Sequence, residues 1–179
     1  MTHAIAVVVF GSSQTVPGSA EWNDAEHVGR RLAESSIAVI TGGYGGTMEA
    51  VSKGASAARG HVIGITAPSV FPGRKGSNPF VKELIEANSL TDRIGLMLDR
   101  AAGAVALPGS IGTAAELLIA WNHNHIARRN GRSVVPTTAV GVGWATMASS
   151  LASENDSIPV DIHLVADSDT GLDWLLTNI

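Results

Sequence analysis

Short apolar runs alternate with longer amphipathic segments along the whole chain. Polar residues rarely interrupt the apolar runs, which is typical of strands buried on both faces of a parallel sheet. These runs predict strands over Ala4–Phe10, Ile37–Thr41, His61–Thr66, Ala104–Leu107, Ser133–Val140 and Ile162–Val165.

Between these runs, apolar residues recur at helical spacing, as Trp22, Ala25 and Val28 do in the first segment. The spacing predicts helices over Ala20–Ser35, Gly46–Arg59, Leu90–Ala101, Ile111–Asn122, Trp144–Ser153 and Thr170–Thr177. Gly60 follows the second helix as its expected C-cap. Such alternation predicts a Rossmann-like α/β fold, doubly wound, with a mostly parallel sheet and helices on both faces. We expect residues 1–179 to form it as one domain.

One long irregular segment, Ala67–Pro79, interrupts this alternation. It is rich in Pro, Gly and Ser, and it contains Arg74, Lys75 and Asn78. Loops of this length inside compact domains often bind ligands or cover a site.

Composition narrows the function classes. The 179 residues are 45% hydrophobic and 16% charged, with a net charge of −4 and no cysteine. This excludes disulfides, thiol nucleophiles and Cys-type metal sites, and it argues against nucleic acid as a partner. The N-terminal apolar run is too short for a signal peptide or a membrane span, so no membrane partner and a cytoplasmic location are expected.

Glycine-rich turns follow three of the predicted strands. They are Gly11-Ser12-Ser13, Gly42-Gly43-Tyr44-Gly45-Gly46-Thr47-Met48 and Pro108-Gly109-Ser110-Ile111-Gly112-Thr113. A glycine turn between a strand and a helix exposes backbone N–H groups at the positive end of the helix dipole, which suits a phosphate. We therefore predict that these turns bind a ligand's phosphate at the carboxyl edge of the sheet.

Several common sites do not fit the sequence. Neither long turn continues into Gly-Lys-Ser/Thr, which disfavours a P-loop NTPase. Gly11 begins no GxGxxG element, and no acidic residue closes the second strand, which disfavours NAD in its usual mode. His123 and His125 are expected to point apart at a helix end. No metal and no cofactor are therefore predicted.

Glu116 follows Thr113 by three residues, and two interpretations of its carboxylate stay open. Ser/Thr-x-x-Glu is the signature of a capping box, in which the glutamate only stabilises the start of a helix. A carboxylate next to a phosphate site is electrostatically costly, which favours a chemical role.

The stretch from Arg93 to Glu116 resembles the LOG family, the cytokinin riboside 5′-monophosphate phosphoribohydrolases often labelled lysine decarboxylases. The family pattern is an arginine on a helix, a methionine four residues later and then PGGxGTxxE, and Arg93, Met97 and residues 108–116 stand in that register. Residues 42–48 are similar to the family's GGxxGxM element, and the resemblance runs from about Ala4 to Val140.

The resemblance implies hydrolysis of the N-glycosidic bond of AMP or an N6-substituted AMP, releasing the base and ribose 5-phosphate. It implies that Arg93 and Glu116 are catalytic and that Met97 lies at the substrate. Glu116 would stabilise an oxocarbenium-like transition state or activate water, and Arg93 would hold the ribose or base. The alternative for Arg93 is a surface ion pair with Asp92 or Asp99.

The chain also departs from the family pattern. Ser110 replaces the second motif glycine, Ile94 stands where a lysine commonly follows the arginine, and Ala115 replaces an acidic residue. These departures resemble a divergent branch that includes relatives of molybdenum-cofactor carriers. A non-catalytic carrier or sensor of a nucleotide or a molybdopterin-type cofactor is therefore the alternative function.

The resemblance further implies a homodimer that pairs through helices near the site. Leu117, Leu118 and Trp121 are apolar positions on one of the predicted helices, and we expect them to contribute to the paired face.

Overall fold

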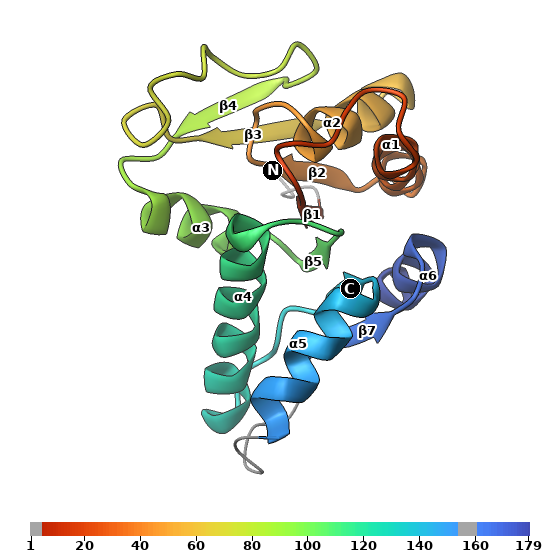
Figure 1. The fold of residues 1–179 in the computed structure, drawn as a ribbon, viewed down its shortest axis with the longest axis vertical. Coiled ribbons are helices and arrows are strands. Elements are labelled where there is room, and N and C mark those ends of the chain that lie inside the picture. The colour runs from red at the N-terminus through yellow and green to blue at the C-terminus, as the bar shows by residue number, and fades with distance from the viewer. Residues whose placement is uncertain (1–4, 154–160) are drawn as a thin grey trace.

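The computed structural model describes residues 5–153 and 161–179, so Ala4, the predicted start of the first strand, lies outside it. Within the described residues, seven strands form one sheet in the order β4-β3-β2-β1-β5-β6-β7 (Figure 1). Every neighbouring pair is parallel. The strands are β1 (Ala6–Phe10), β2 (Ala38–Thr41), β3 (Val62–Thr66), β4 (Glu83–Glu86), β5 (Gly103–Ala106), β6 (Thr137–Val140) and β7 (His163–Val165).

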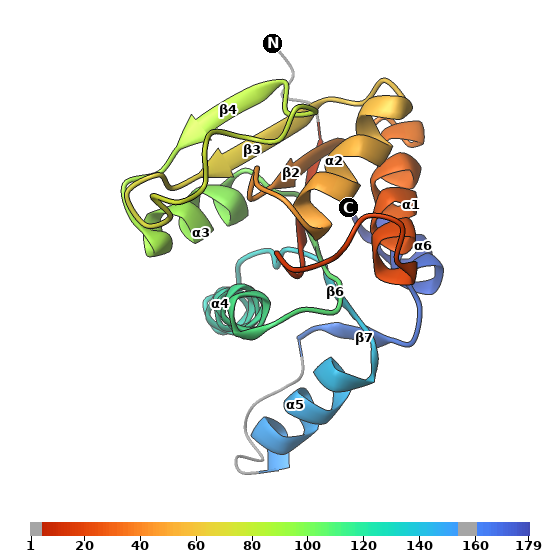
Figure 2. The same ribbon diagram turned by 45° about the horizontal axis from the view of Figure 1, so that its top comes forward.

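Helices cover both faces of this sheet, which confirms the predicted doubly wound α/β fold (Figure 2). They are α1 (Ala20–Glu34), α2 (Thr47–Ala57), α3 (Leu90–Asp99), α4 (Ile111–Arg129), α5 (Val142–Ser153) and α6 (Ser168–Asn178). None of the helices in the described part of the chain is long and apolar enough to cross a membrane.

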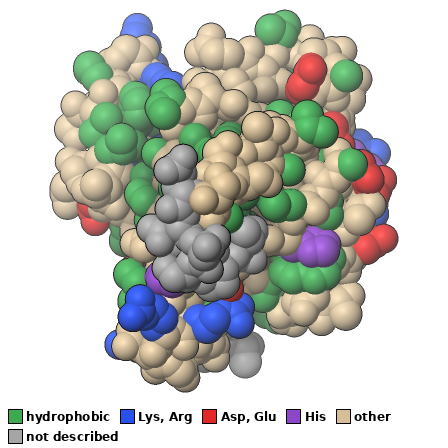
Figure 3. Space-filling view, turned by 60° about the horizontal axis from the view of Figure 1, so that its bottom comes forward, with side chains coloured by type: hydrophobic (Ala, Val, Ile, Leu, Met, Phe, Trp, Pro, Cys, Tyr) green, Lys and Arg blue, Asp and Glu red, His purple; other side chains and the backbone are tan. Residues whose placement is uncertain are grey.

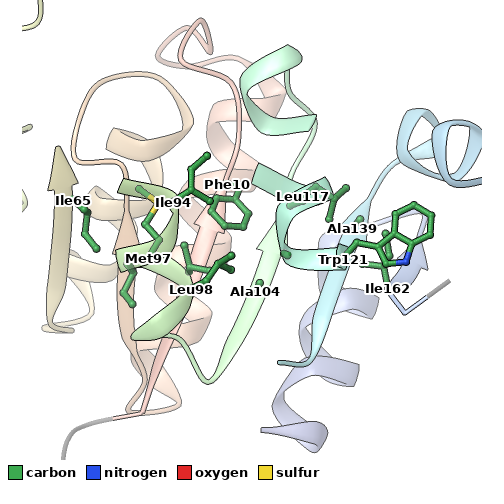
Figure 4. Close-up of a cluster of buried hydrophobic side chains, with 14 of the residues drawn as sticks. Phe10, Ile65, Ile94, Met97, Leu98, Ala104, Leu117, Trp121, Ala139 and Ile162 are labelled. Carbon is green, nitrogen blue, oxygen red and sulfur yellow. The ribbon is translucent and has the colours of Figure 1, made fainter. Parts of the chain in front are cut away.

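Alternate residues of the central strand β1 build two separate cores. Val7 and Val9 pack with α1, α2 and α6 on one face of the sheet. Val8 and Phe10 pack with α3, α4 and α5 on the other, where Figure 4 shows Phe10 near Ile94 of α3 and Leu117 of α4. The period of two in a strand thus distributes one apolar run over both cores.

Strand β4 is the one strand of the described sheet that the apolar pattern misses. Its sequence is Glu-Leu-Ile-Glu, and it pairs only with β3 at the edge of the sheet. Its side chains remain largely exposed, so no buried face requires a continuous apolar run.

Helix α4 continues to Arg129, beyond its predicted end at Asn122. Asn124 explains the extension, because its buried amide donates to the carbonyl of Val135 (2.8 Å) and accepts from the N–H of the same residue (2.9 Å). The last turns of α4 are thereby fixed to the segment that leads into β6. The polar sequence His123-Asn124-His125 gives no indication of this contact, so the predicted helix ended too early.

The end of α2 also differs from the prediction. Its C-cap is Ala58, and Arg59 rather than Gly60 adopts the left-handed conformation, with φ of 62°. A side chain at Gly60 would collide with the side chain of Ala33. Gly60 is therefore required for the close approach of α1 and not for its own backbone angle.

Candidate functional site

A cavity of about 280 Å³ lies at the carboxyl edge of the sheet, where the loops after β1 and β5 diverge. Strand order reverses at this point, and ligands of doubly wound proteins bind in such crevices. Of the predicted site residues, the cavity is lined by Gly11, Ser13, Gly42, Met48, Arg93, Ser110, Gly112, Thr113 and Glu116. The structure therefore brings parts of all three glycine turns together.

Arg93 lies at the centre of this arrangement and is only 4% exposed. Its Nε donates to the carbonyl of Ile65 (2.7 Å), and its Nη2 lies 3.7 Å from the sulfur of Met48. A side chain at Gly42 would overlap the Arg93 guanidinium and the same sulfur. The first turn thus needs glycine at this position to accommodate Arg93, rather than a phosphate.

Glu116 faces Arg93 across the cavity, with Oε1 at 3.6 Å from Nη1. Burial raises the pKa of Glu116 to about 7, although the positive charge of Arg93 opposes this rise. Burial also lowers the pKa of Arg93, against the opposing effect of Glu116. The pair is therefore a partly desolvated couple whose carboxyl can lose or gain a proton near neutral pH, and the surface ion pair for Arg93 is wrong.

The capping-box interpretation of Glu116 is also wrong. Ser110 is the N-cap of α4, and Thr113 lies inside the first turn with its side chain buried. Glu116 therefore belongs to the second turn, too far along the helix to cap its first N–H groups. Its side chain turns instead to Arg93.

The helix that carries Glu116 begins without a side-chain cap, and so does α2. Neither Ser110 nor Gly46 makes a side-chain capping hydrogen bond. By contrast, Ser19, Ser89 and Asp167 cap α1, α3 and α6. The uncapped N–H groups of α4 begin at the cavity, where an anion would satisfy them and interact with the helix dipole.

Several hydroxyl groups of the predicted phosphate site are already engaged in the fold. Ser12 Oγ accepts from the N–H of Gln14 (3.0 Å), and the Thr47 hydroxyl lies 2.8 Å from that of Thr15. The Thr47 N–H donates to the carbonyl of Ser12 (2.8 Å). These bonds fix the loop after β1 to the start of α2, leaving Ser13 as the serine of that loop that lines the cavity.

The remaining predicted residues do not line the cavity. Met97 is 1% exposed in the core, Ile111 is 86% exposed, and the hydroxyl of Tyr44 accepts from the N–H of Ala67 (2.9 Å). The others belong to the turns but stand outside the cavity wall: Gly43, Gly45, Gly46, Pro108 and Gly109. We keep the roles of all these residues as predictions.

Phe71 and Arg74 also line the cavity, although they belong to none of the glycine turns or motifs that predict the site. They come from the irregular segment after β3, which Asn78 fixes in place. The Asn78 amide donates to the carbonyls of Gly43 (3.2 Å) and Tyr44 (3.1 Å). The sequence offered one indication of their role: an aromatic residue and an arginine lie in a Pro- and Gly-rich loop that follows a strand.

The segment His123–His125 offers two histidines as candidate metal ligands. Across residues 5–153 and 161–179, no group of three or more His, Cys, Asp or Glu side chains could hold a metal ion. Asn124 between them is committed to Val135.

The names of curated proteins with similar sequences describe enzymes that act on nucleotides. The pyrimidine/purine nucleotide 5′-monophosphate nucleosidase of Escherichia coli K12 is 36% identical over 107 residues, which cover 55% of this chain and 23% of that protein. The cytokinin riboside 5′-monophosphate phosphoribohydrolase of Mycobacterium marinum is 32% identical over 109 residues, covering 60% of this chain and 58% of that protein. The chain thus spans less than two thirds of either relative.

Solved structures extend the comparison over nearly the whole chain. The molybdenum cofactor binding protein of Rippkaea orientalis superposes with a TM-score of 0.73 at 21% identity, covering 99% of this chain and 97% of that one. The molybdenum cofactor carrier protein of Chlamydomonas reinhardtii gives 0.68 at 21% identity, covering 97% and 99%. At such identities the likeness concerns the fold.

Together these matches confirm the resemblance to the LOG phosphoribohydrolases. The model of one family, LDcluster4, matches residues 4–128, well over half of the 179 residues. The chain therefore belongs to the SLOG cluster4 family.

Proposed function

We propose that this protein is a cytoplasmic phosphoribohydrolase that cleaves the N-glycosidic bond of a nucleoside 5′-monophosphate, a class in which the resemblance implies AMP or an N6-substituted AMP. One observation carries the proposal: a buried carboxyl with a pKa of about 7, Glu116, faces a buried guanidinium, Arg93, in a cavity bordered by an uncapped helix N-terminus. The names of the sequence relatives support the same reaction class.

In this proposal the 5′-phosphate binds at the start of α4, beside Gly112 and Thr113. The C1′–N bond breaks and its electron pair goes to the leaving base, which takes up a proton from solvent. Water adds to C1′ and gives a proton to the Glu116 carboxylate, which also stabilises the oxocarbenium-like transition state. Arg93 holds the substrate and limits how far Glu116 turns toward the phosphate.

A non-catalytic carrier of a nucleotide or a molybdopterin-type cofactor is the second candidate. Ser110 and Ile94, which depart from the motif of the catalytic relatives, both line the cavity and favour it. Tight binding of AMP without release of any base, observed by chromatography, would support this function over hydrolysis.

Glu116→Gln should lower the rate of hydrolysis by a factor on the order of 10² or more, because the amide can neither stabilise the developing cation nor accept a proton. Release of adenine from AMP, measured by chromatography, checks this. Glu116 points into the cavity rather than capping α4, so the variant should remain folded at neutral pH. A variant that loses its fold but keeps the turnover of its folded fraction would contradict the catalytic role.

The pH dependence of stability should differ between wild type and Glu116→Gln. Since burial raises the pKa of Glu116 in the folded state to about 7 from its ordinary 4.5, its protonated form favours the folded state. This contribution is complete below about pH 4.5 and is lost as pH rises toward 7, about 3 kcal/mol in all. Melting temperatures from pH 4.5 to 8 should therefore fall for wild type relative to the variant. Parallel curves would refute the raised pKa.

Catalysis should show the opposite pH trend, because the carboxylate is the active form. We expect kcat/KM for AMP to rise with pH below about 7 and to level off above it. A rate profile from pH 5.5 to 8.5 tests this, and a rate that falls through pH 7 would make Glu116 an acid instead.

Gly112→Val should weaken AMP binding at least tenfold. Gly112 lines the cavity, and a Cβ added there has no neighbouring atom within 4 Å, so we expect the valine to fill the proposed phosphate space without disturbing the turn. At Gly109 the side chain would instead collide with Thr113 and disturb the turn. Gly95→Val is the matched control, a helical glycine with open space that does not line the cavity. Equal calorimetric AMP affinity in both variants would refute the phosphate position.

We also propose a homodimer, on a revised set of residues. Leu117 and Trp121 are buried in the core, whereas Leu118, Ile119 and Ile126 of α4 are exposed. Figure 3 shows one face of the molecule, where hydrophobic side chains are exposed at several places among polar ones. Ile119→Lys with Ile126→Lys should give a monomer by light scattering, while Leu84→Lys on β4 should leave a dimer. A monomeric wild type at micromolar concentration would contradict the proposal.

A further inference from the structure

Arg74 is a cation at the site that the proposed reaction does not use. Its guanidinium carbon lies 4.4 Å from the ring centre of Phe71 and 4.9 Å from that of Tyr44. These two rings are themselves in edge contact, 5.7 Å apart. Stacking on aromatic rings holds the planar guanidinium in a defined orientation and leaves its N–H groups free at the edge.

The guanidinium of Arg74 has no hydrogen bond or ion pair within the described residues. Arg93, by comparison, already contacts Ile65, Met48 and Glu116. The positive charge of Arg74 is close enough to contribute to the lowered pKa of Arg93. Two guanidinium groups therefore share a cavity that offers a single carboxylate, Glu116, and Arg74 is left to interact with an electron-rich ligand group.

A chain of contacts connects α4, where the phosphate is proposed to bind, with Arg74 at its other end. Glu116 is on α4 and Arg93 lies next to it. The ring centres of Tyr44 and Phe71 lie 5.7 Å from the guanidinium carbon of Arg93, and Arg74 stacks on the same two rings. Phe71 provides an apolar aromatic surface at this end, joined by Leu90 and Ile94 of the cavity wall. A nucleotide with its phosphate at α4 would have its base here.

A second cavity of about 340 Å³, which we call the annex, opens on the other side of Arg74. Its polar wall includes Lys75, Asn78 and Glu49. An apolar substituent on the base would therefore extend from Phe71 into polar surroundings. Tyr44 and Pro79 are the residues of the annex wall that offer apolar surface, and Arg74 and Phe71 already pack against the Tyr44 ring. We therefore expect an N6-alkyl group to gain little over a hydrogen atom.

A guanidinium has five N–H donors and no acceptor. The O6 and N7 edge of a 6-oxopurine presents two acceptors with the spacing of that fork, and it is the commonest specific partner of arginine among the bases. Adenine has an acceptor at N7 but a donor at its N6 amino group, and this donor cannot form a hydrogen bond with the N–H groups of Arg74. The donors of Arg74 thus distinguish the two purine classes.

We propose that Arg74 is a specificity-determining residue that selects 6-oxopurine nucleoside 5′-monophosphates, through their O6 and N7 acceptors, over AMP and N6-alkylated AMP. This inference rests on the proposed function for the position of the phosphate, and it revises the base that the resemblance implies. It does not depend on turnover, because it concerns recognition in the bound state.

The test is a comparison of dissociation constants for GMP, IMP, AMP and isopentenyl-AMP by calorimetry. It uses the full chain carrying Glu116→Gln, which prevents consumption of the ligands, with wild type in parallel. We expect GMP and IMP to bind about tenfold more tightly than AMP, and isopentenyl-AMP to bind no better than AMP. IMP separates recognition of O6 and N7 from recognition of the 2-amino group of GMP.

Variants of Arg74 and of the neighbouring Lys75 show which side chain causes the preference for IMP over AMP. Arg74→Met should equalise the IMP and AMP affinities, and Arg74→Lys should lose most of the difference because a point charge lacks the fork. Lys75→Met, a charge change on the same loop that lines only the annex, should keep the full difference. Thermal melting confirms that each variant is folded.

Two results would overturn the inference: AMP binding as tightly as IMP, or an IMP preference that survives Arg74→Met in folded protein. These outcomes differ from failure of the proposed function. A protein that prefers IMP through Arg74 but releases no base contradicts hydrolysis alone, whereas one that hydrolyses AMP without any preference for IMP contradicts only the role of Arg74.

Discussion

The burial of Arg93 is the constraint on which the rest of the site depends. A guanidinium removed from water needs hydrogen bonds and a compensating charge, and the surrounding elements supply them. The end of β3 offers the Ile65 carbonyl, α4 offers Glu116, and Gly42 leaves the space. Because these groups come from segments far apart in the sequence, the position of one side chain fixes the relation of β2, β3, α3 and α4.

This arrangement changes the pKa of Glu116. A carboxyl next to an arginine would ordinarily be strongly acidic, yet here desolvation outweighs the attraction of Arg93 and the pKa is raised. The separation of 3.6 Å between the charged atoms and the burial of the carboxyl together account for this balance. A group held in that state can exchange a proton at neutral pH, which is what a hydrolytic site requires and a purely structural ion pair avoids.

Periodicity predicted the parallel sheet and the layered helices because each strand of the centre is buried on both faces. It missed β4 because an edge strand with exposed Glu83 and Glu86 needs no apolar run. The sequence motif located Arg93 and Glu116, but the contact between their side chains depends on tertiary packing. Thr113 and Glu116 matched a capping box because local sequence does not show that Ser110 starts the helix. The place of Arg74 likewise follows from its contacts with Tyr44 and Phe71, which no local pattern encodes.

The short, acidic edge strand has a consequence for how copies of this protein can meet. An open strand edge is a template for another strand, and charged side chains on a brief edge oppose such pairing. Glutamates stand at both ends of its four residues: Glu83 is hydrogen-bonded to His61, and the carboxylate of Glu86 opposes the approach of an identical edge. The sheet therefore ends at β4 on this side, and the chain is protected there from the edge-to-edge stacking that leads to fibrils.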